Sequence, residues 1–240
     1  MERIPNFGLA MRGRMTHPLD KAHTPGAPAS ATQIKTRSIG PLTRLFDIVF
    51  AVAAIVFFAP LMVFIAIAIA MSSPGSVIFA HSRVGQNGKL FPCLKFRTMV
   101  VNADEELQRV LKSSAAARAE WETDHKLKND PRITPIGKWL RKFSLDELPQ
   151  LFNILIGQMS VVGPRPIVID EIKKYGKFFD DYCSVRPGLT GLWQVSGRND
   201  ISYDARVQLD VSYARNRTLL LDMKIVLQTV PAVIAFRGSY

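Results

Sequence analysis

Two adjacent carboxylates, Asp146 and Glu147, lie in the segment SLDELPQLFNIL, between a basic run and an apolar pattern with helical spacing. Ser144 and Glu147 match a capping box, in which both side chains serve only to cap a helix. Pro149 argues against this interpretation, because proline is favoured at the first helical position and clashes with the preceding turn deeper inside a helix. The helix is therefore predicted to begin near Leu148, which leaves both acids on the loop that enters it.

The surroundings of these acids suit phosphoryl chemistry. An ionised carboxylate can attack phosphorus or bind a hard cation such as Mg2+, and neighbouring acids can divide those tasks. Arg141 shortly precedes the acids and is expected to keep them ionised. Arginine also binds phosphate oxygens in a bidentate manner, and Arg165 is held in an extended turn by the prolines on both sides of it. Together with Lys95 on an expected strand, these residues predict phosphoryl transfer.

Composition limits the classes of protein that fit. The chain has 240 residues, enough for one sizeable core, and its formal net charge of +11 predicts an anionic partner. Nucleic acid, anionic lipid and phosphorylated substrates all satisfy that charge. Cys93 and Cys183 are far apart and the histidines show no ligand spacing, which argues against a disulfide framework, a zinc site or a histidine-based triad. The sequence also contains no Walker loop and no Rossmann glycine pattern, which argues against nucleotide-hydrolysing and dinucleotide enzymes.

An uninterrupted apolar run covers residues 48–71, long enough for a membrane segment. Pro60 lies at its centre and predicts a bend, and each half is only about 18 Å long at 1.5 Å per residue. Basic residues flank both ends of the run: Lys35, Arg37 and Arg44 before it, and Arg83, Lys89, Lys95 and Arg97 after it. Because both flanks favour the cytoplasm, a re-entrant helix bent at Pro60 is predicted. A tilted, kinked single span is the alternative, and a buried helix of a soluble core is a weaker one.

The remaining patterns predict short elements. Strands are expected at residues 77–80 and 89–96 around a turn at 85–88, a Gly-rich loop at 186–198, and helices at 104–128, 136–143, 148–157, 203–216 and 219–236. The helix at 136–143 is basic and amphipathic and carries Trp139, which suits either a membrane interface or a surface helix packed on the core.

Six segments, taken in series, are similar to those of a known family. They are Arg44-x-x-Asp47, KFRTM at 95–99, DPR at 130–132, LRKFSLDELPQLFNIL at 140–155, MSVVGPRP at 159–166 and RPGLTGLWQVSGR at 186–198. Over residues 40–240 the chain resembles the bacterial sugar transferases, the monotopic polyprenyl-phosphate phosphoglycosyl transferases. Its short form looks closest to the galactosyl-phosphate transferases that initiate exopolysaccharide synthesis.

The resemblance implies an activity and a role for each site residue. Asp146 would attack the sugar-bearing phosphate of a UDP-sugar, release UMP and form a covalent phospho-sugar intermediate, from which undecaprenyl phosphate takes the sugar phosphate. Glu147 would help to hold Mg2+, and Lys95, Arg141 and Arg165 would contact phosphate. No nucleic-acid partner is implied. UDP-galactose is the favoured donor by resemblance, while glucose and N-acetylated sugars stay open.

The resemblance also implies an architecture. The expected fold class is α+β and mostly helical, with a re-entrant membrane helix at 41–73 and a catalytic domain at 74–240. Residues 1–40, a mixture of Pro, Gly, Ala, Ser and Thr with scattered Arg and Lys, are predicted from their composition to form a disordered basic tail. The expected location is the cytoplasmic face of the bacterial inner membrane. Members of this family often have serine before the central proline, whereas this chain has Ala59 before Pro60, which keeps the kinked span open.

A non-catalytic alternative shares part of the pattern. A basic membrane-surface module that recruits polysaccharide-assembly proteins would explain the charge and the apolar run, but it would leave the acidic pair without a role. Neither a homo-oligomer nor a complex with assembly proteins is specified by the residues.

Overall fold

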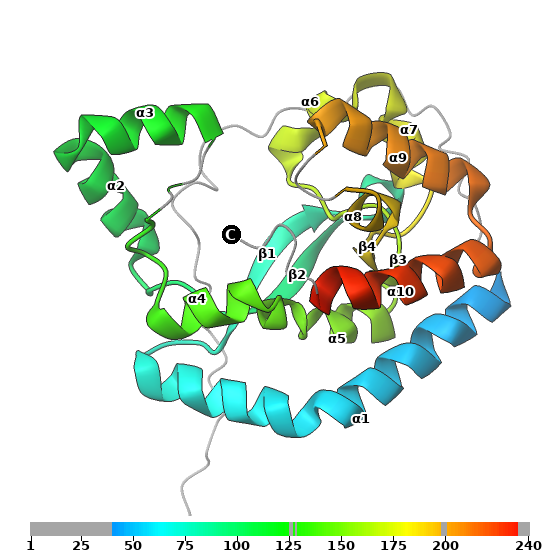
Figure 1. Ribbon diagram of the computed structural model, residues 1–240, viewed down its shortest axis with the longest axis horizontal. Helices are drawn as coiled ribbons and strands as arrows, with labels where there is room; N and C mark the ends of the chain where they lie inside the picture. Colours follow the sequence, from blue (N-terminus) through cyan, green and yellow to red (C-terminus); the bar gives the residue numbers. More distant parts are fainter. Residues whose placement is uncertain (1–39, 125–126, 128, 198–200, 235–240) are drawn as a thin grey trace, which may run out of the picture. The chain divides into compact units, whose positions relative to one another are not determined.

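The computed structural model describes residues 40–124, 127, 129–197 and 201–234 (Figure 1). Within that part the chain is mostly helical and contains two two-stranded sheets, so the α+β class is confirmed. The predicted basic tail lies outside the described residues except for Gly40.

The apolar run forms one long helix, α1 (Pro41–Ser72), of 32 residues that continues through Pro60. Figure 1 shows its ribbon, blue to cyan, as bent, with both ends turned towards the strands. Its most apolar 18-residue window has a mean hydropathy of 2.9, and only 11% of that window is buried. Among the described helices this is the one long and apolar enough to cross a membrane by length and composition. Its exposed apolar side chains therefore need a partner that is not water.

Arg44 fixes the first half of α1 to a neighbouring helix, α5 (Gln150–Leu155). Its guanidinium donates to the carbonyl oxygens of Ile154, at 2.7 Å, and Leu155, at 2.6 Å. These carbonyls belong to the last turn of α5, and the Ile154 carbonyl also accepts from the Gly157 amide at 3.0 Å. Arg44 therefore caps α5 and joins it to α1.

Asp47 makes a second connection, to strand β3 (Ser160–Val162). The residue is fully buried, and its carboxylate accepts hydrogen bonds from the Ser160 hydroxyl at 2.9 Å and the Val161 amide at 2.9 Å. Arg217 also donates to the Ser160 oxygen, at 3.0 Å. A buried carboxylate needs such donors, because its transfer from water is otherwise costly. The Arg44-x-x-Asp47 motif thus anchors α1 to the rest of the described chain.

The predicted hairpin is confirmed, and its first strand is longer than expected. Strands β1 (Ile78–Val84) and β2 (Leu90–Phe96) pair antiparallel through all seven positions. A short 3-10 turn, η2 (Gln86–Gly88), connects them, and Asn87 adopts a left-handed φ of 60°. Asparagine tolerates that conformation better than most residues, which explains its place in the turn.

The single helix predicted at residues 104–128 is wrong, because residues 103–124 form two helices, α2 (Ala103–Ser113) and α3 (Ala115–Asp124). Residues 125, 126 and 128 of that prediction lie outside the described residues. Ser114 separates them with an extended backbone, and its hydroxyl accepts a hydrogen bond from the Ala117 amide at 3.1 Å. Serine competes with helical hydrogen bonds in this way and favours caps over helix interiors.

The basic amphipathic helix is confirmed as α4 (Pro135–Lys142). Thr134 caps it by accepting from the Gly137 amide at 3.0 Å. Leu140 is buried on one side, whereas Trp139 is 64% exposed on the other. The buried side packs against the second half of α1 and the end of β2, in a cluster of Ile65, Ile69, Phe96 and Leu140.

The rest of the described chain contains a small parallel sheet and several helices. Strand β3 pairs with β4 (Gly188–Thr190). The other elements are η4 (Ile169–Glu171), α6 (Ile172–Tyr175), η5 (Gly176–Phe178), α7 (Phe179–Cys183), α8 (Leu192–Val195), α9 (Tyr203–Asn216) and α10 (Leu219–Ile234). The last two confirm the predicted helices, although the predicted end of the second lies outside the described residues. The Gly-rich segment at 186–198 is not only a loop, because β4 and α8 lie within it.

Candidate active site

The acidic pair lies in a 3-10 turn, η3 (Leu145–Glu147), before helix α5. Ser144 has a left-handed φ of 55°, and its side chain makes no capping hydrogen bond there. The capping-box interpretation is therefore wrong, and the acids are free of that role. Helix α5 begins at Gln150, slightly later than predicted, so Pro149 precedes the first helical residue instead of occupying it.

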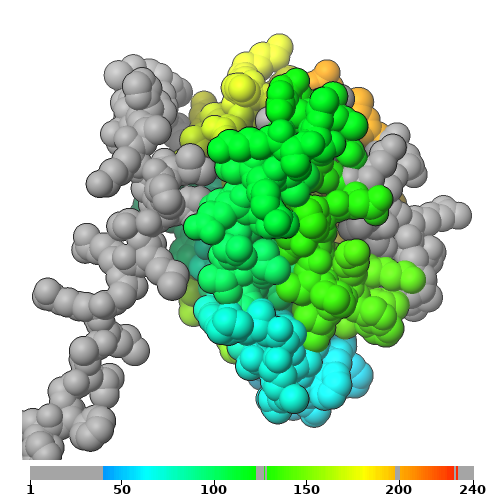
Figure 2. Space-filling model, turned by 90° about the vertical axis from the view of Figure 1, so that its left-hand side faces the viewer, coloured from blue at the N-terminus to red at the C-terminus, as the bar shows by residue number. Residues whose placement is uncertain are grey.

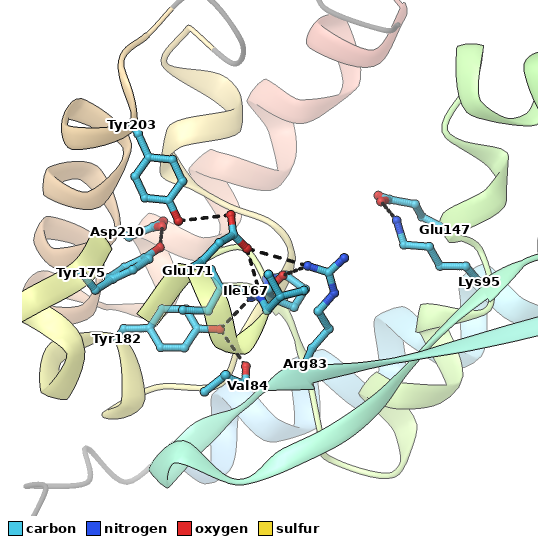
Figure 3. Close-up of polar contacts among 12 residues, drawn as sticks. Arg83, Val84, Lys95, Glu147, Ile167, Glu171, Tyr175, Tyr182, Tyr203 and Asp210 are labelled. Carbon is cyan, nitrogen blue, oxygen red and sulfur yellow. Dashed lines mark hydrogen bonds and ion pairs between the residues drawn. The ribbon is translucent and has the colours of Figure 1, made fainter. Parts of the chain in front are cut away.

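Glu147 forms an ion pair with Lys95 on β2, with 2.7 Å between Nζ and Oε1 (Figure 3). Burial opposes ionisation of Glu147, but the charges of Lys95 and Arg165 outweigh it and lower the pKa of this carboxyl below its usual range. A hydrogen bond from Gln150 acts in the same direction. Glu147 is therefore a stable anion at neutral pH.

Asp146 has the opposite setting. Only 9% of the residue is exposed, and burial together with the charge of Glu147 raises the pKa of its carboxyl. Lys95 and Arg141 counteract that rise without cancelling it. Burial therefore has a larger effect on the pKa of Asp146 than the nearby cations have. A carboxylate with a raised pKa and little hydration is the more basic of the two and the better nucleophile.

Arg141 reaches the acids from the last turn of α4. Its Nε donates to the Thr98 hydroxyl at 2.9 Å, and its charge interacts with that of Asp146. Close by, Asp130 and Arg132 of the DPR segment form a buried ion pair with 2.7 Å between Nη2 and Oδ2. Since Asp130 also interacts with the charge of Arg141, this pair helps to set the field around the site.

Arg165 follows β3 and is exposed, with its guanidinium 5.8 Å from the ring centre of Trp193. Arg206 lies over the same ring at 4.2 Å. Arg83 donates from Nη1 to the Pro166 carbonyl at 3.2 Å, so it holds the segment that carries Arg165. From the sequence, Arg83 was noted only as a cation that follows the apolar run, and Arg206 was not singled out, although Trp193 stands in one of the quoted motifs.

A tyrosine fixes the Arg165 segment to the hairpin (Figure 3). The Tyr182 hydroxyl donates to the Val84 carbonyl at 2.7 Å and accepts from the Ile167 amide at 3.3 Å. The Val84 amide in turn donates to the Ile167 carbonyl at 2.9 Å. Glu171 adds an ion pair with Arg83 at 3.9 Å. These contacts give Arg165 a defined position relative to β1 and β2.

Asn153 is a second positioning residue that the sequence reasoning missed. It is fully buried, donates to the Pro92 carbonyl at 2.8 Å and accepts from the Leu94 amide at 2.9 Å. It thereby joins α5 to the strand beside Lys95. Asn153 lies three residues after Gln150 within an otherwise apolar helical pattern, and this was the available signal in the sequence. An amide at such a position needs hydrogen-bond partners when it is buried.

The structure brings the predicted site residues together. Glu147 contacts Lys95 directly, while the charges of Arg141 and Arg165 act on Asp146 and Glu147 respectively. Two carboxylates and several cations from different elements therefore converge on one place, as a phosphoryl-transfer site requires.

The acids also fit a metal ion of a particular kind. Within the described residues, no three His, Cys, Asp or Glu side chains are grouped to hold a metal. Mg2+ is commonly bound by only one or two carboxylates together with substrate phosphates. Asp146 and Glu147 supply hard oxygen ligands in that number, and the Glu147 side chain is 34% exposed. The pair suits an ion shared with a substrate and not one enclosed by the protein.

Comparison with known proteins identifies the family. The family model described as bacterial sugar transferase matches residues 39–236. The chain belongs to the bacterial sugar transferase family. The resemblance stated from the six motifs is thus confirmed, and this sugar transferase is an enzyme.

Several curated relatives are similar over most of this sugar transferase. It is 51% identical over 205 residues to the exopolysaccharide production protein ExoY of Sinorhizobium fredii, covering 85% of this chain and 91% of that protein. It is 52% identical over 204 residues to an undecaprenyl-phosphate galactose phosphotransferase of Salmonella typhimurium, covering 85% of this chain and 43% of that protein. A UDP-galactose-lipid carrier transferase of Erwinia amylovora is 49% identical over 199 residues, which cover 83% of this chain and 42% of that protein. The chain therefore spans nearly the whole of the first relative and less than half of the other two.

Proposed function

We propose that this sugar transferase moves a sugar 1-phosphate, with galactose 1-phosphate as the first candidate, from a UDP-sugar to undecaprenyl phosphate. The observation that carries the proposal is the buried Asp146 beside the ionised Glu147, with Lys95, Arg141 and Arg165 around them. The names of the Salmonella and Erwinia relatives support the lipid carrier and galactose. The name of the Sinorhizobium relative supports a place in exopolysaccharide production.

In the first step the Asp146 carboxylate oxygen attacks the phosphorus that bears the sugar. A bond forms between that oxygen and phosphorus, and the bond to the oxygen bridging the two phosphates breaks. UMP leaves with the electron pair. Lys95 and Arg165 would stabilise the negative charge that gathers on the phosphate oxygens.

In the second step an oxygen of the lipid phosphate attacks the same phosphorus. The bond between phosphorus and Asp146 breaks, the carboxylate is regenerated, and a polyprenyl diphosphate sugar is released. Splitting the transfer into two displacements lets one site serve two substrates in turn. Arg141, within electrostatic reach of Asp146, suits the incoming phosphate.

Mg2+ is proposed as the cofactor, with Glu147 as its main ligand. When bound, the ion would neutralise diphosphate charge and orient the leaving group. Lys95 competes for the same carboxylate, so the ion pair would adjust when the metal and the donor bind. Chelation with EDTA is expected to abolish transfer, and added Mg2+ to restore it.

Membrane association follows from α1 in this proposal. The helix would enter the cytoplasmic leaflet, bend at Pro60 and leave on the same face, so that the site meets the lipid phosphate at the inner membrane. The cations on both flanks and the bent ribbon in Figure 1 support re-entry.

A two-stage assay with radiolabelled UDP-sugars tests the proposal. Without acceptor, wild-type protein should release UMP and retain label on the protein, and added undecaprenyl phosphate should remove that label. Asp146→Asn should lower both reactions at least about 1,000-fold, because the nucleophile is lost. Glu147→Gln should lower them about 100-fold or more.

Two results would contradict the proposal in different ways. Full transfer by Asp146→Asn would remove the nucleophile assignment while keeping the reaction. No transfer by wild-type protein with any UDP-sugar would favour the non-catalytic surface module.

A further inference from the structure

An apolar groove of about 400 Å³ lies between the second half of α1 and helix α4. Leu61, Phe64 and Ala68 line it from α1, and Ile136 and Trp139 line it from α4. Its volume is in the range of pockets that hold small organic ligands. None of the roles assigned above uses this groove.

The lining of the groove includes the residue directly before the acidic pair. Leu145 lines it and is joined by one peptide bond to Asp146, which puts their Cα atoms about 3.8 Å apart. A chain-like ligand in the groove can therefore end beside the proposed nucleophile.

The groove has a buried floor and exposed walls. Ile65 and Leu140 are 4% and 3% exposed, whereas Phe64 and Trp139 are 68% and 64% exposed. Figure 2 shows this end of α1, in cyan, directly below the green part of the chain. Exposed apolar walls on a helix this hydrophobic indicate an opening to lipid and not to water.

Charge indicates which lipid fits. Helix α4 carries Lys138 and Lys142 on its exposed surface and Arg141 in its last turn, so cations lie next to an apolar groove. A ligand with an apolar chain and an anionic head group matches both features. The phosphate head group of the acceptor lipid must also reach the phosphorus bound to Asp146. A phospholipid of the surrounding bilayer has no such requirement.

We propose that this groove binds the isoprenoid units nearest the phosphate of the polyprenyl phosphate acceptor. The inference rests on the proposed function for the identity of the acceptor and adds its binding subsite. Binding there would align the lipid phosphate with Asp146 while the remainder of the chain stays in the bilayer.

Filling the groove tests the proposal. Ala68→Trp places a large ring inside it, and Val63→Trp, at a 58% exposed position on the same helix outside the lining, is the matched control. Ala68→Trp should raise the acceptor KM at least about tenfold, which is about 1.4 kcal/mol. Donor-dependent UMP release without acceptor should stay at the wild-type rate in both variants. An unchanged acceptor KM in Ala68→Trp would overturn the subsite.

A binding experiment makes the test independent of the donor reaction. A farnesyl phosphate with a photoreactive diazirine on its chain should crosslink to peptides containing residues 61–68 or 135–140, and Ala68→Trp should lose this crosslink. Unlabelled undecaprenyl phosphate should compete, while a large excess of phosphatidylglycerol should not. Equal competition by phosphatidylglycerol would assign the groove to bulk lipid and overturn the proposal. A wild-type protein that crosslinks but releases no UMP would keep the subsite and reject the proposed reaction.

Discussion

Asp146 and Glu147 are neighbours in sequence, yet their surroundings shift their pKa values in opposite directions. Burial raises the pKa of Asp146, whereas Lys95 and Arg165 overcome burial and lower that of Glu147. Two titratable groups whose pKa values are separated by their surroundings commonly divide acid, base and electrostatic tasks. The more basic carboxylate suits attack on phosphorus, and the stable anion suits a metal ion.

Lys95→Met tests the ion pair at the residue scale. Loss of the 2.7 Å contact should raise the pKa of Glu147 and lower transfer about 100-fold, because a charge aimed at the phosphates is also lost. The melting temperature should change little, since such partly exposed pairs contribute about 1 kcal/mol or less. Arg109→Met removes the Glu106 pair on α2 and serves as control. Wild-type activity in Lys95→Met would contradict this assignment.

Asp210 predicts a pH dependence of stability. It is 1% exposed, and burial raises its pKa to about 7, despite a hydrogen bond from the Tyr175 hydroxyl at 2.7 Å. The folded state therefore keeps a proton that the unfolded chain releases above about pH 4. Stability should fall as pH rises between these values, by up to about 1.4 kcal/mol per pH unit. Asp210→Asn should flatten that slope in thermal unfolding from pH 5 to 8, and an equal slope in both proteins would refute the prediction.

Elements place these residues through a few close contacts. The cation Arg141 depends on α4, and α4 depends on Gly137, where an added Cβ would collide with the Thr98 carbonyl. Lys95 depends on β2, which Asn153 joins to α5. The geometry of the site is therefore sensitive to substitutions that touch no substrate.

Gly137→Ala tests the contact between α4 and the end of β2. The collision should push α4 away, cost about 1–3 kcal/mol of stability and lower activity by moving the arginine at its end. Gly40→Ala is the matched control, since nothing lies within 4 Å of an added Cβ there. Melting temperature in detergent and UMP release measure the two effects. Equal behaviour of the two variants would show that the helix adjusts without consequence.

Asp47→Ala tests the connection between α1 and β3. The Ser160 hydroxyl and the Val161 amide would lose a buried acceptor, at an expected cost of about 1–3 kcal/mol for each donor left unsatisfied. Asp170→Ala, at an exposed position, should change the free energy of unfolding by less than about 0.5 kcal/mol. A similar decrease in the free energy of unfolding in both variants would mean that the buried Asp47 carboxylate contributes no more to stability than an exposed one.

Elements with strong local signals could be predicted from the sequence. The hairpin, α4 and α9 each have a clear period, turn residues or caps, and they form where expected. Strand β4 and helix α8 are only three and four residues long, and β4 depends on pairing with a strand distant in sequence, so local patterns do not reveal them. The break at Ser114 was missed because one side-chain hydrogen bond decides it.

Only part of the site could be predicted from the sequence, because its geometry also depends on contacts between residues that are distant in sequence. Its acids and cations stand out as residue types, and the motif resemblance assigned their roles. Their pairing is a tertiary property, because Lys95 and Glu147 are 52 residues apart in sequence. The raised pKa of Asp146 likewise follows from burial that no spacing shows.

At the scale of the whole molecule, the described chain combines a polar site with a helix whose apolar surface is mostly uncovered. Exposed apolar residues also occur on α5, directly after it and on α10, including Phe152, Ile156, Leu220 and Leu227. Apolar surface of this extent suits a membrane interface, where water no longer contacts it.

Cysteine labelling tests the topology of α1. Gly40→Cys and Ser76→Cys, on either side of the helix, should both react from the same face of sealed vesicles if the helix re-enters. The native thiols should give little background, because Cys93 and Cys183 are buried and burial raises the pKa of Cys183 to about 12. Reaction from opposite faces would establish a kinked span in place of re-entry.

The connection made by Asp47 has a mechanical consequence. The Asp47 carboxylate binds the Val161 amide and so joins α1 to the rest of the described chain. The depth of α1 in a bilayer would therefore also set the height of the reactive site above that bilayer. A displacement of α1 along the membrane normal by about 5.4 Å, the length of one helical turn, would move the site by the same distance. In the proposed reaction, the Arg44-x-x-Asp47 motif would therefore set how far a lipid phosphate must rise to reach the site.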